Sequence, residues 1–157
     1  MITRKELDKI ISEQKSNCCG PDDIPFIFIQ NLPEIGKTTL LEIFNIMWTQ
    51  HKFPKKWKHA TIIPIHKPNQ NKFLVQGYRP ILLLCTMSKI FEKIISVRLN
   101  WFLEKNKLLA EEQFGFRKNR STYDCLINIE TEICETIACN QYMGLISFDI
   151  QKAYDMT

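Results

Sequence analysis

The stretch that decides the fold lies near the end of the chain: Leu145-Ile146-Ser147-Phe148-Asp149-Ile150-Gln151-Lys152-Ala153-Tyr154-Asp155. Its first half is apolar, and we expect a β-strand over residues 143–150. Asp149 falls near the end of that strand, where a sheet can present a carboxylate to a cleft. An aspartate at a strand end more often starts a turn, so the interpretation depends on the rest of the chain.

Charge is unevenly distributed along the 157 residues, although 21 basic and 17 acidic residues nearly balance. No acidic residue occurs between Ile43 and Phe91, and aromatic residues such as Trp57 and Tyr78 are interleaved with the basic ones. Cations can contact phosphates and rings can stack on bases or sugars, so this stretch suits a polyanion. A solvated basic surface is the alternative. The basic residues are Lys52, Lys55, Lys56, Lys58, Lys67, Lys72, Arg79 and Lys89.

Composition excludes several classes of protein. Hydrophobic residues make up 45% of the chain, and Gly and Pro contribute only 5 and 7 residues, which excludes collagen-like, low-complexity and disordered chains. The longest apolar run, Ile81 to Cys85, is far shorter than the ~18–20 residues that span a bilayer. No signal peptide is apparent, and the cysteines follow no disulfide framework. We therefore expect an intracellular protein, nuclear or cytoplasmic and not secreted, with no membrane partner.

Local patterns predict a helix-rich α/β domain without repeats or linkers. Capping boxes that begin at Thr3 and Thr39 predict helices to about Lys15 and His51. Residues 24–32 fit either a strand or a short helix. The remaining expected elements are strands at 60–66 and 78–84, with Pro64 favouring an edge, and helices at 88–103 and 121–138, the last with Leu126, Ile127, Ile133 and Ile137 facing inward.

The segment from Phe148 to Asp155 resembles motif A of reverse transcriptases: an apolar strand, Asp, three residues, Ala and an aromatic residue. Four segments that precede it resemble other motifs of the family, in the family's order. They are Gly20-Pro21-Asp22-Asp23-Ile24-Pro25, similar to a segment of non-LTR retrotransposon enzymes; residues 57–68, similar to motif 1; residues 78–93, similar to motif 2; and residues 113–122, Gln-Phe-Gly-Phe-Arg-Lys-Asn-Arg-Ser-Thr, similar to motif 2a. The set is specific and is most similar to the LINE-type, jockey-like group.

The resemblance implies an α/β fold: the fingers and first palm strand of a right-hand polymerase in residues 20–157, preceded by a helix in residues 1–19 that leads into the domain. It implies an RNA-directed DNA polymerase that uses deoxynucleoside triphosphates, an RNA template, a DNA primer and Mg²⁺. The Tyr/Phe-x-Asp-Asp motif and the thumb have no counterpart in these residues, so we expect the chain alone to be inactive. The alternatives are an inactive relic that at most binds nucleic acid, and a group II intron maturase-like enzyme.

The resemblance also assigns roles to individual residues. Asp149 is the implied catalytic residue and Mg²⁺ ligand. Lys67 and Arg79 match the positions that hold the triphosphate of the incoming nucleotide, where arginine offers a fork and lysine a point charge. Tyr154 matches the aromatic residue that excludes a ribose 2′-hydroxyl. Template or primer phosphates are the implied partners of Lys55, Lys56, Lys58, Arg117, Lys118 and Arg120. A surface cation or a core aromatic residue without such a role is the alternative for each.

Three positions depart from the family pattern. Asp23 stands where glycine is usual, Leu82 replaces the commoner serine after Arg-Pro-Ile, and Cys85-Thr86 occupies a place where serine is frequent. These departures are modest and leave the resemblance intact.

Overall fold

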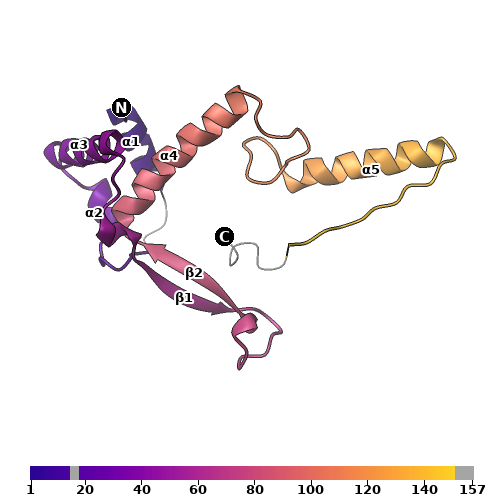
Figure 1. Cartoon of the computed structure of the whole chain (residues 1–157), viewed down its shortest axis with the longest axis horizontal. Coiled ribbons are helices and arrows are strands. Elements are labelled where there is room, and N and C mark those ends of the chain that lie inside the picture. Colours follow the sequence, from indigo (N-terminus) through magenta and orange to yellow (C-terminus); the bar gives the residue numbers. More distant parts are fainter. Residues whose placement is uncertain (15–17, 151–157) are drawn as a thin grey trace. The chain divides into compact units, whose positions relative to one another are not determined.

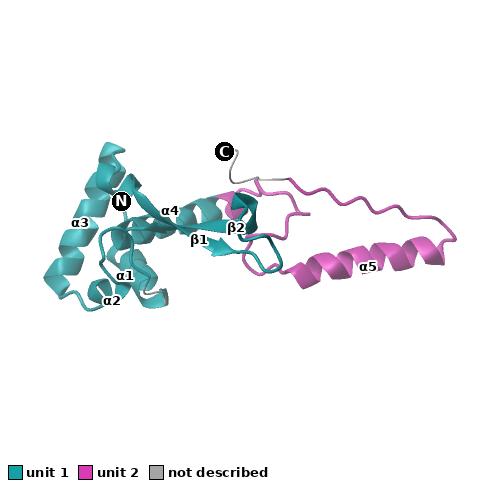
Figure 2. Ribbon diagram, turned by 90° about the horizontal axis from the view of Figure 1, so that it is seen from below, with its two compact units in different colours: residues 1–102 teal, residues 103–157 magenta. Residues whose placement is uncertain are grey.

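The computed structural model describes residues 1–14 and 18–150. The chain divides into two compact units, Met1–Phe102 and Leu103–Thr157, which are described separately (Figure 2). The elements, in chain order, are α1 (Arg4–Glu13), α2 (Phe26–Gln30), α3 (Glu34–Gln50), the 3₁₀-helix η1 (Lys55–Lys58), β1 (Ala60–His66), the 3₁₀-helix η2 (Val75–Gly77), β2 (Tyr78–Leu84), α4 (Thr86–Lys105) and α5 (Thr122–Ala138) (Figure 1). This mixture of helices and strands confirms the predicted class. None of the helices in the described residues is long and apolar enough to cross a membrane.

Two helices begin at the capping boxes that bound them. Thr3 Oγ1 accepts a hydrogen bond from the Glu6 N–H at 3.3 Å, and the Glu6 carboxylate accepts one from the Thr3 N–H at 2.8 Å. Ser121 and Asp124 form the same reciprocal pair at the start of α5. Each box satisfies backbone donors that have no partner within the helix, which explains why these starts could be predicted.

The predicted start at Thr39 was wrong, because α3 begins at Glu34, directly after Pro33. Thr39 lies inside the helix, where its hydroxyl donates to the Ile35 carbonyl at 3.0 Å. The first buried residue of α3 is Leu40, so the first turn of the helix adds little to the hydrophobic periodicity from which a helix start is inferred. The ambiguous segment 24–32 contains the short helix α2 and no strand.

The core of unit 1 is built from helices. Phe44 is fully buried at its centre, with ring centroids 5.2 Å from Phe91 and 6.2 Å from Trp57. Burying a side chain of this size stabilises the fold by about 1.5–3 kcal/mol relative to leaving it in water. The buried residues of this cluster are Ile2, Leu7, Ile10, Ile11, Phe26, Ile29, Leu40, Phe44, Met47, Ile90, Phe91 and Ile94.

The turn at Gly20 packs against the end of β2. A Cβ at Gly20 would lie 2.3 Å from the Leu84 carbonyl oxygen, so no larger residue fits there without a backbone shift. The Thr86 hydroxyl donates to the Ile24 carbonyl at 2.5 Å, which ties the turn to the start of α4. Asp23, which replaces the family's usual glycine, has a φ of +52°, a conformation that glycine adopts more readily.

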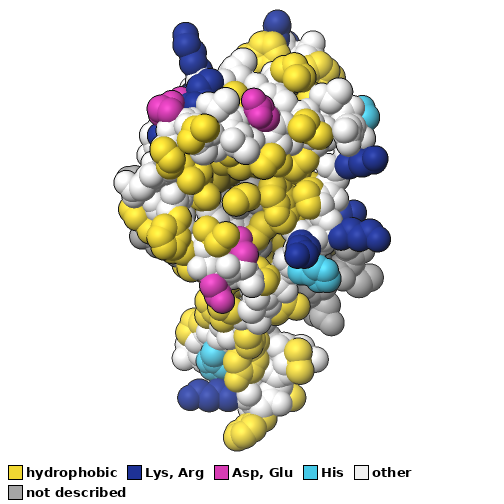
Figure 3. Space-filling view, turned by 90° about the vertical axis from the view of Figure 1, so that its left-hand side faces the viewer, with side chains coloured by type: hydrophobic (Ala, Val, Ile, Leu, Met, Phe, Trp, Pro, Cys, Tyr) yellow, Lys and Arg dark blue, Asp and Glu magenta, His cyan; other side chains and the backbone are white. Residues whose placement is uncertain are grey.

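Strands β1 and β2 have the predicted bounds, and they form an antiparallel hairpin with pairs from Ala60↔Leu84 to His66↔Tyr78. The Lys67 N–H donates to the Gly77 carbonyl at 2.7 Å and extends the ladder by one pair. Hydrogen-bonded and non-hydrogen-bonded pairs alternate, so the facing Pro64 and Pro80 occupy a non-hydrogen-bonded pair and interrupt no bond between the strands. The hairpin extends away from the helices of unit 1 (Figures 1 and 3).

Unit 2 differs from the sequence prediction in two respects. The α5 residues expected to face inward are exposed, for example Leu126 (55%) and Ile137 (66%). Residues 141–150 are exposed and have no regular structure, so the predicted strand at 143–150 was wrong. An apolar stripe becomes a core only when another element covers it, and a strand needs a neighbour for its backbone groups. Within the described residues, no strand pairs with 143–150.

Candidate nucleic-acid interface

Lys67 and Arg79 lie on the same face of the β1–β2 hairpin. Arg79 pairs with Ile65, and Lys67 follows Ile65 by two residues, opposite Gly77. Diagonal positions of this kind are roughly 7–8 Å apart, within reach of two long side chains that grip one ligand. The Lys67 ammonium donates to the Gln76 carbonyl at 2.9 Å and keeps two further N–H donors. Arg79 is exposed and forms no salt bridge with any described residue.

The loop between the strands is held at both ends. The Tyr78 hydroxyl donates to the Lys72 carbonyl at 3.0 Å, and the His66 Nε2 lies 3.0 Å from the Gln70 carbonyl oxygen. The His66 and Tyr78 rings contact each other edge to face, with centroids 5.2 Å apart. Both rings lie on the hairpin face opposite Lys67 and Arg79. These contacts fix the end of the hairpin at which the two cations are presented.

The short helix η1 presents three lysines on the surface. Trp57 packs against Phe44 and Phe53, with centroids 6.2 and 5.9 Å apart, and so anchors the helix to the core. The three remaining residues of η1, Lys55, Lys56 and Lys58, are all exposed. The structure therefore brings these three predicted phosphate contacts together on one turn.

Arg117 has a partner within unit 2 that sequence reasoning missed. Its guanidinium forms two parallel hydrogen bonds with the Glu104 carboxylate, at 2.9 and 2.8 Å, and a third with the Ala110 carbonyl at 2.7 Å. The Arg117 side chain is only 10% exposed, and these hydrogen bonds hold the pKa of Glu104 below its usual range. Arg117 therefore fixes the backbone around it. In the sequence, the two residues are opposite charges thirteen positions apart, and no local pattern connects them.

Lys118 and Arg120 lie in the same irregular stretch of unit 2. Lys118 is exposed. The Arg120 guanidinium lies over the Phe114 ring, 5.2 Å from its centroid, and donates to the Glu111 carbonyl. Arg120 keeps donors for an anion, whereas most of those of Arg117 are occupied.

Asp149 lies in the exposed segment 141–150, without regular structure. Tyr154 and Asp155 fall outside the described residues. A carboxylate is the ligand type that Mg²⁺ prefers, but one carboxylate does not make a site. Nowhere in residues 1–14 and 18–150 do three or more His, Cys, Asp or Glu side chains come together in a group that could hold a metal ion.

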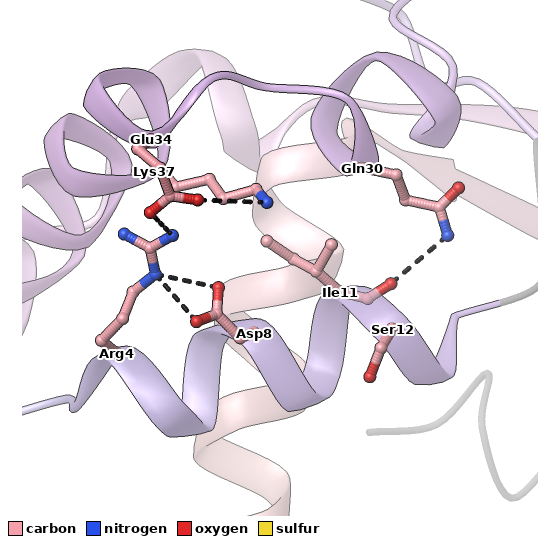
Figure 4. Close-up of a pocket in the computed structure, with 7 residues that line it drawn as sticks. All are labelled: Arg4, Asp8, Ile11, Ser12, Gln30, Glu34 and Lys37. Atoms are coloured by element: carbon pink, nitrogen blue, oxygen red, sulfur yellow. Dashed lines mark hydrogen bonds and ion pairs between the residues drawn. The ribbon is translucent and has the colours of Figure 1, made fainter.

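A pocket of about 450 Å³ in unit 1 contains none of the predicted site residues (Figure 4). Its charged side chains pair with one another. Arg4 contacts Asp8 at 2.9 Å and Glu34 at 2.7 Å, and Lys37 lies 3.8 Å from Glu34. The Arg4–Glu34 pair connects α1 to α3, and the other two pairs lie within one helix each, so the cluster has a structural explanation.

Known proteins resemble this chain along nearly its whole length. The family described as reverse transcriptase (RNA-dependent DNA polymerase) matches residues 65–156, which include Lys67, Arg79 and Asp149. In Drosophila melanogaster, the protein named "probable RNA-directed DNA polymerase from transposon BS" is 33% identical over 87% of the chain and 15% of that protein. The RNA-directed DNA polymerase from mobile element jockey of the same species is 32% identical over 98% of the chain and 17% of that protein.

The chain thus spans less than a fifth of the length of these curated relatives. The family match covers more than half of the residues of the chain, and it includes the end of the hairpin that carries Lys67 and Arg79. These matches confirm the resemblance inferred from the motifs: the chain belongs to the reverse transcriptase family, in the jockey-like group of non-LTR retrotransposons.

Proposed function

We propose that the chain is a segment of an RNA-directed DNA polymerase, covering the fingers and the start of the palm of a right-hand polymerase, and that its hairpin grips the triphosphate of the incoming deoxynucleotide. The observation that carries the proposal is the strand register, which places Lys67 and Arg79 on one face of the hairpin. They lie within a stretch from Ile43 to Phe91 that contains no acidic residue to compete for them.

The chemistry of the two side chains suits a triphosphate. Arg79 can donate two parallel hydrogen bonds to phosphate oxygens, and Lys67 adds a point charge beside it. Negative charge moves onto the leaving phosphate during the reaction. Cations that are already held at a fixed spacing stabilise this charge, because they need not rearrange as it develops. The loop contacts of His66 and Tyr78 supply that rigidity.

The metal and the sugar-selecting residue belong to the same proposal. Mg²⁺ neutralises phosphate charge and orients the reacting oxygens in this chemistry. Asp149 would contribute one carboxylate to it, and Tyr154 would contact the sugar. Lys55, Lys56, Lys58, Lys118 and Arg120 would contact template or primer phosphates. Arg117 takes a positioning role, because Glu104 and Ala110 already occupy most of its donors.

A binding experiment tests the triphosphate grip. The 157-residue chain is titrated into a fluorescent deoxynucleoside triphosphate, and Lys67→Gln and Arg79→Gln are compared with Lys93→Gln, an exposed control on α4. Charge-assisted hydrogen bonds of about 1.5–3 kcal/mol predict a roughly 10- to 100-fold loss for each hairpin variant. The control should bind like the original chain. Equal affinities for all three variants would contradict the proposal.

Catalysis is tested in a longer enzyme made by joining the palm and thumb of a relative to this chain. Asp149→Ala should abolish DNA synthesis, since losing a ligand changes the charge and geometry of a metal site. Tyr154→Ala should leave DNA synthesis measurable and admit ribonucleotides more readily. If the Asp149→Ala polymerase synthesises DNA at the normal rate, Asp149 is not a required Mg²⁺ ligand.

A further inference from the structure

Residues 67–77, here called the tip loop, form hydrogen bonds to many of their own backbone groups. The Phe73 N–H donates to the Asn71 Oδ1 at 2.9 Å, and the Leu74 N–H donates to the Asn71 carbonyl at 3.3 Å. The Gly77 N–H donates to the Leu74 carbonyl at 3.0 Å, and the Lys67 N–H to the Gly77 carbonyl at 2.7 Å. Loops with close ends and internal packing of this kind hold a defined conformation. The tip loop is therefore a fixed support for its outward side chains.

Three consecutive exposed side chains of the tip loop are apolar, although most of the other side chains of the loop are polar. Phe73 is 96% exposed, Val75 86% and Leu74 54%. Isolated exposed hydrophobic residues are common, but three in succession on an ordered loop form a patch that indicates an interaction surface. Hydrophobic side chains stand at the end of the hairpin beside a basic one, at the bottom of Figure 3.

The charges around the patch indicate what covers it. Lys67 and Lys72 belong to the tip loop, Arg79 follows it on β2, and the flanking sequence contains no acidic residue. The partner must therefore combine negative charge with a flat apolar surface. Unpaired nucleotides have both, because each phosphate is joined to a base whose face can stack on an aromatic ring.

We propose that the tip loop binds single-stranded nucleic acid, with the Phe73 ring stacked on an unpaired base and Lys72 on a neighbouring phosphate. The inference rests on the proposed function, because the same hairpin carries the triphosphate grip. It adds a second contact on a different part of the hairpin, which discriminates by strandedness. A duplex buries its base faces, so Phe73 has nothing to stack on except at the ends.

The test uses the 157-residue chain and fluorescein-labelled RNA of 20 nucleotides, single-stranded or as a blunt duplex, with anisotropy as the readout. Phe73→Ala should weaken single-strand binding roughly 5- to 100-fold, the range measured for loss of one base–aromatic stack. Duplex binding should change less than twofold. Phe73→Trp should restore single-strand affinity, and the control Phe28→Ala, which removes a 63% exposed ring from α2, should change neither.

The salt dependence separates stacking from charge. Phe73→Ala should leave the slope of log affinity against log salt unchanged, whereas Lys72→Ala should reduce it by about 0.7. Equal losses for single strand and duplex, or a Phe73→Ala variant that binds like Phe28→Ala, would overturn the proposal. So would intact RNA binding together with a Phe73-dependent attachment to phosphatidylserine vesicles, which would make the tip loop a membrane contact.

The two proposals fail separately. If Lys67→Gln and Arg79→Gln bind the triphosphate normally while Phe73→Ala loses single-strand affinity, the triphosphate grip is wrong and the tip loop contact stands. If the reverse is found, only the tip loop contact is wrong.

Discussion

Glu6 connects the start of α1 to α4, and its replacement by glutamine should remove stability that depends on pH. The Glu6 carboxylate accepts hydrogen bonds from Arg98 at 2.8 and 2.9 Å and from the Thr3 N–H at 2.8 Å. The Arg98 hydrogen bonds, with help from Thr3, lower the pKa of Glu6 from its ordinary 4.5 to about 2. Glutamine keeps a carbonyl for Thr3 and loses the charge that Arg98 requires.

The size of the effect follows from this pKa shift. A shift of that size corresponds to a ceiling of about 3 kcal/mol. The Glu6 side chain is 35% exposed, and solvent screening reduces the expected contribution to about 1–2 kcal/mol. Because the folded-state pKa is lowered, the stabilisation is fully present above the unfolded pKa near 4.5. It is lost as pH falls through the folded pKa near 2.

The assay is urea unfolding followed by tryptophan fluorescence. All three tryptophans, Trp48, Trp57 and Trp101, lie in unit 1, and the Arg98 guanidinium lies 5.3 Å from the Trp48 ring. The free energy of unfolding of the Glu6→Gln variant should be about 1–2 kcal/mol lower at pH 7. The difference should shrink between pH 5 and pH 2.

A double-mutant cycle with Arg98→Met assigns the effect to the pair, since methionine keeps much of the apolar stem. A difference between Glu6→Gln and the original chain that stays constant from pH 7 to pH 2 would refute the reasoning. It would show that the carboxylate contributes through packing or capping and not through its charge.

Three further changes have defined expectations. Gly20→Ala places a Cβ 2.3 Å from the Leu84 carbonyl oxygen and should lower the free energy of unfolding by about 1–3 kcal/mol, whereas Gly115→Ala, with open space around it, should not. Asp23→Gly relieves a φ of +52° and should raise the free energy of unfolding by roughly 0.5–1 kcal/mol. Urea unfolding measures the two alanine variants and Asp23→Gly. Arg117→Lys cannot keep the paired hydrogen bonds to Glu104, so limited proteolysis should cut residues 105–120 faster. An unchanged cleavage pattern would contradict that ion pair.

Local signals predicted much of unit 1. The capping box at Thr3, the β-branched run of β1 and the apolar run of β2 act over a few residues, so the sequence alone contains the physics that fixes them. The start of α3 was missed because its first turn contains no buried residue. Hydrophobic periodicity shows only the buried part of a helix.

Unit 2 was predicted less well, because its expectations depended on partners. The apolar stripe of α5 and the apolar run at 143–150 are real sequence features, but periodicity does not say what covers them. The residues predicted to bind phosphate differ in the same way: local structure places some of them, and a distant partner decides the role of another. The hairpin register places Lys67 beside Arg79, whereas Arg117, which looked equally suited to phosphate, is occupied by Glu104. A side-chain pair thirteen residues apart leaves no local pattern to find.

The facing prolines of the hairpin have a consequence for self-association. Non-hydrogen-bonded pairs turn their N–H groups outward, so Pro64 and Pro80 remove one donor from each outer edge at the same level. A two-stranded ribbon with exposed isoleucines on its faces would otherwise offer two open edges to another chain. With both edges interrupted at the middle, a third strand cannot pair along the full length of either one. The hairpin can therefore expose apolar side chains and stay two-stranded, without seeding a growing sheet.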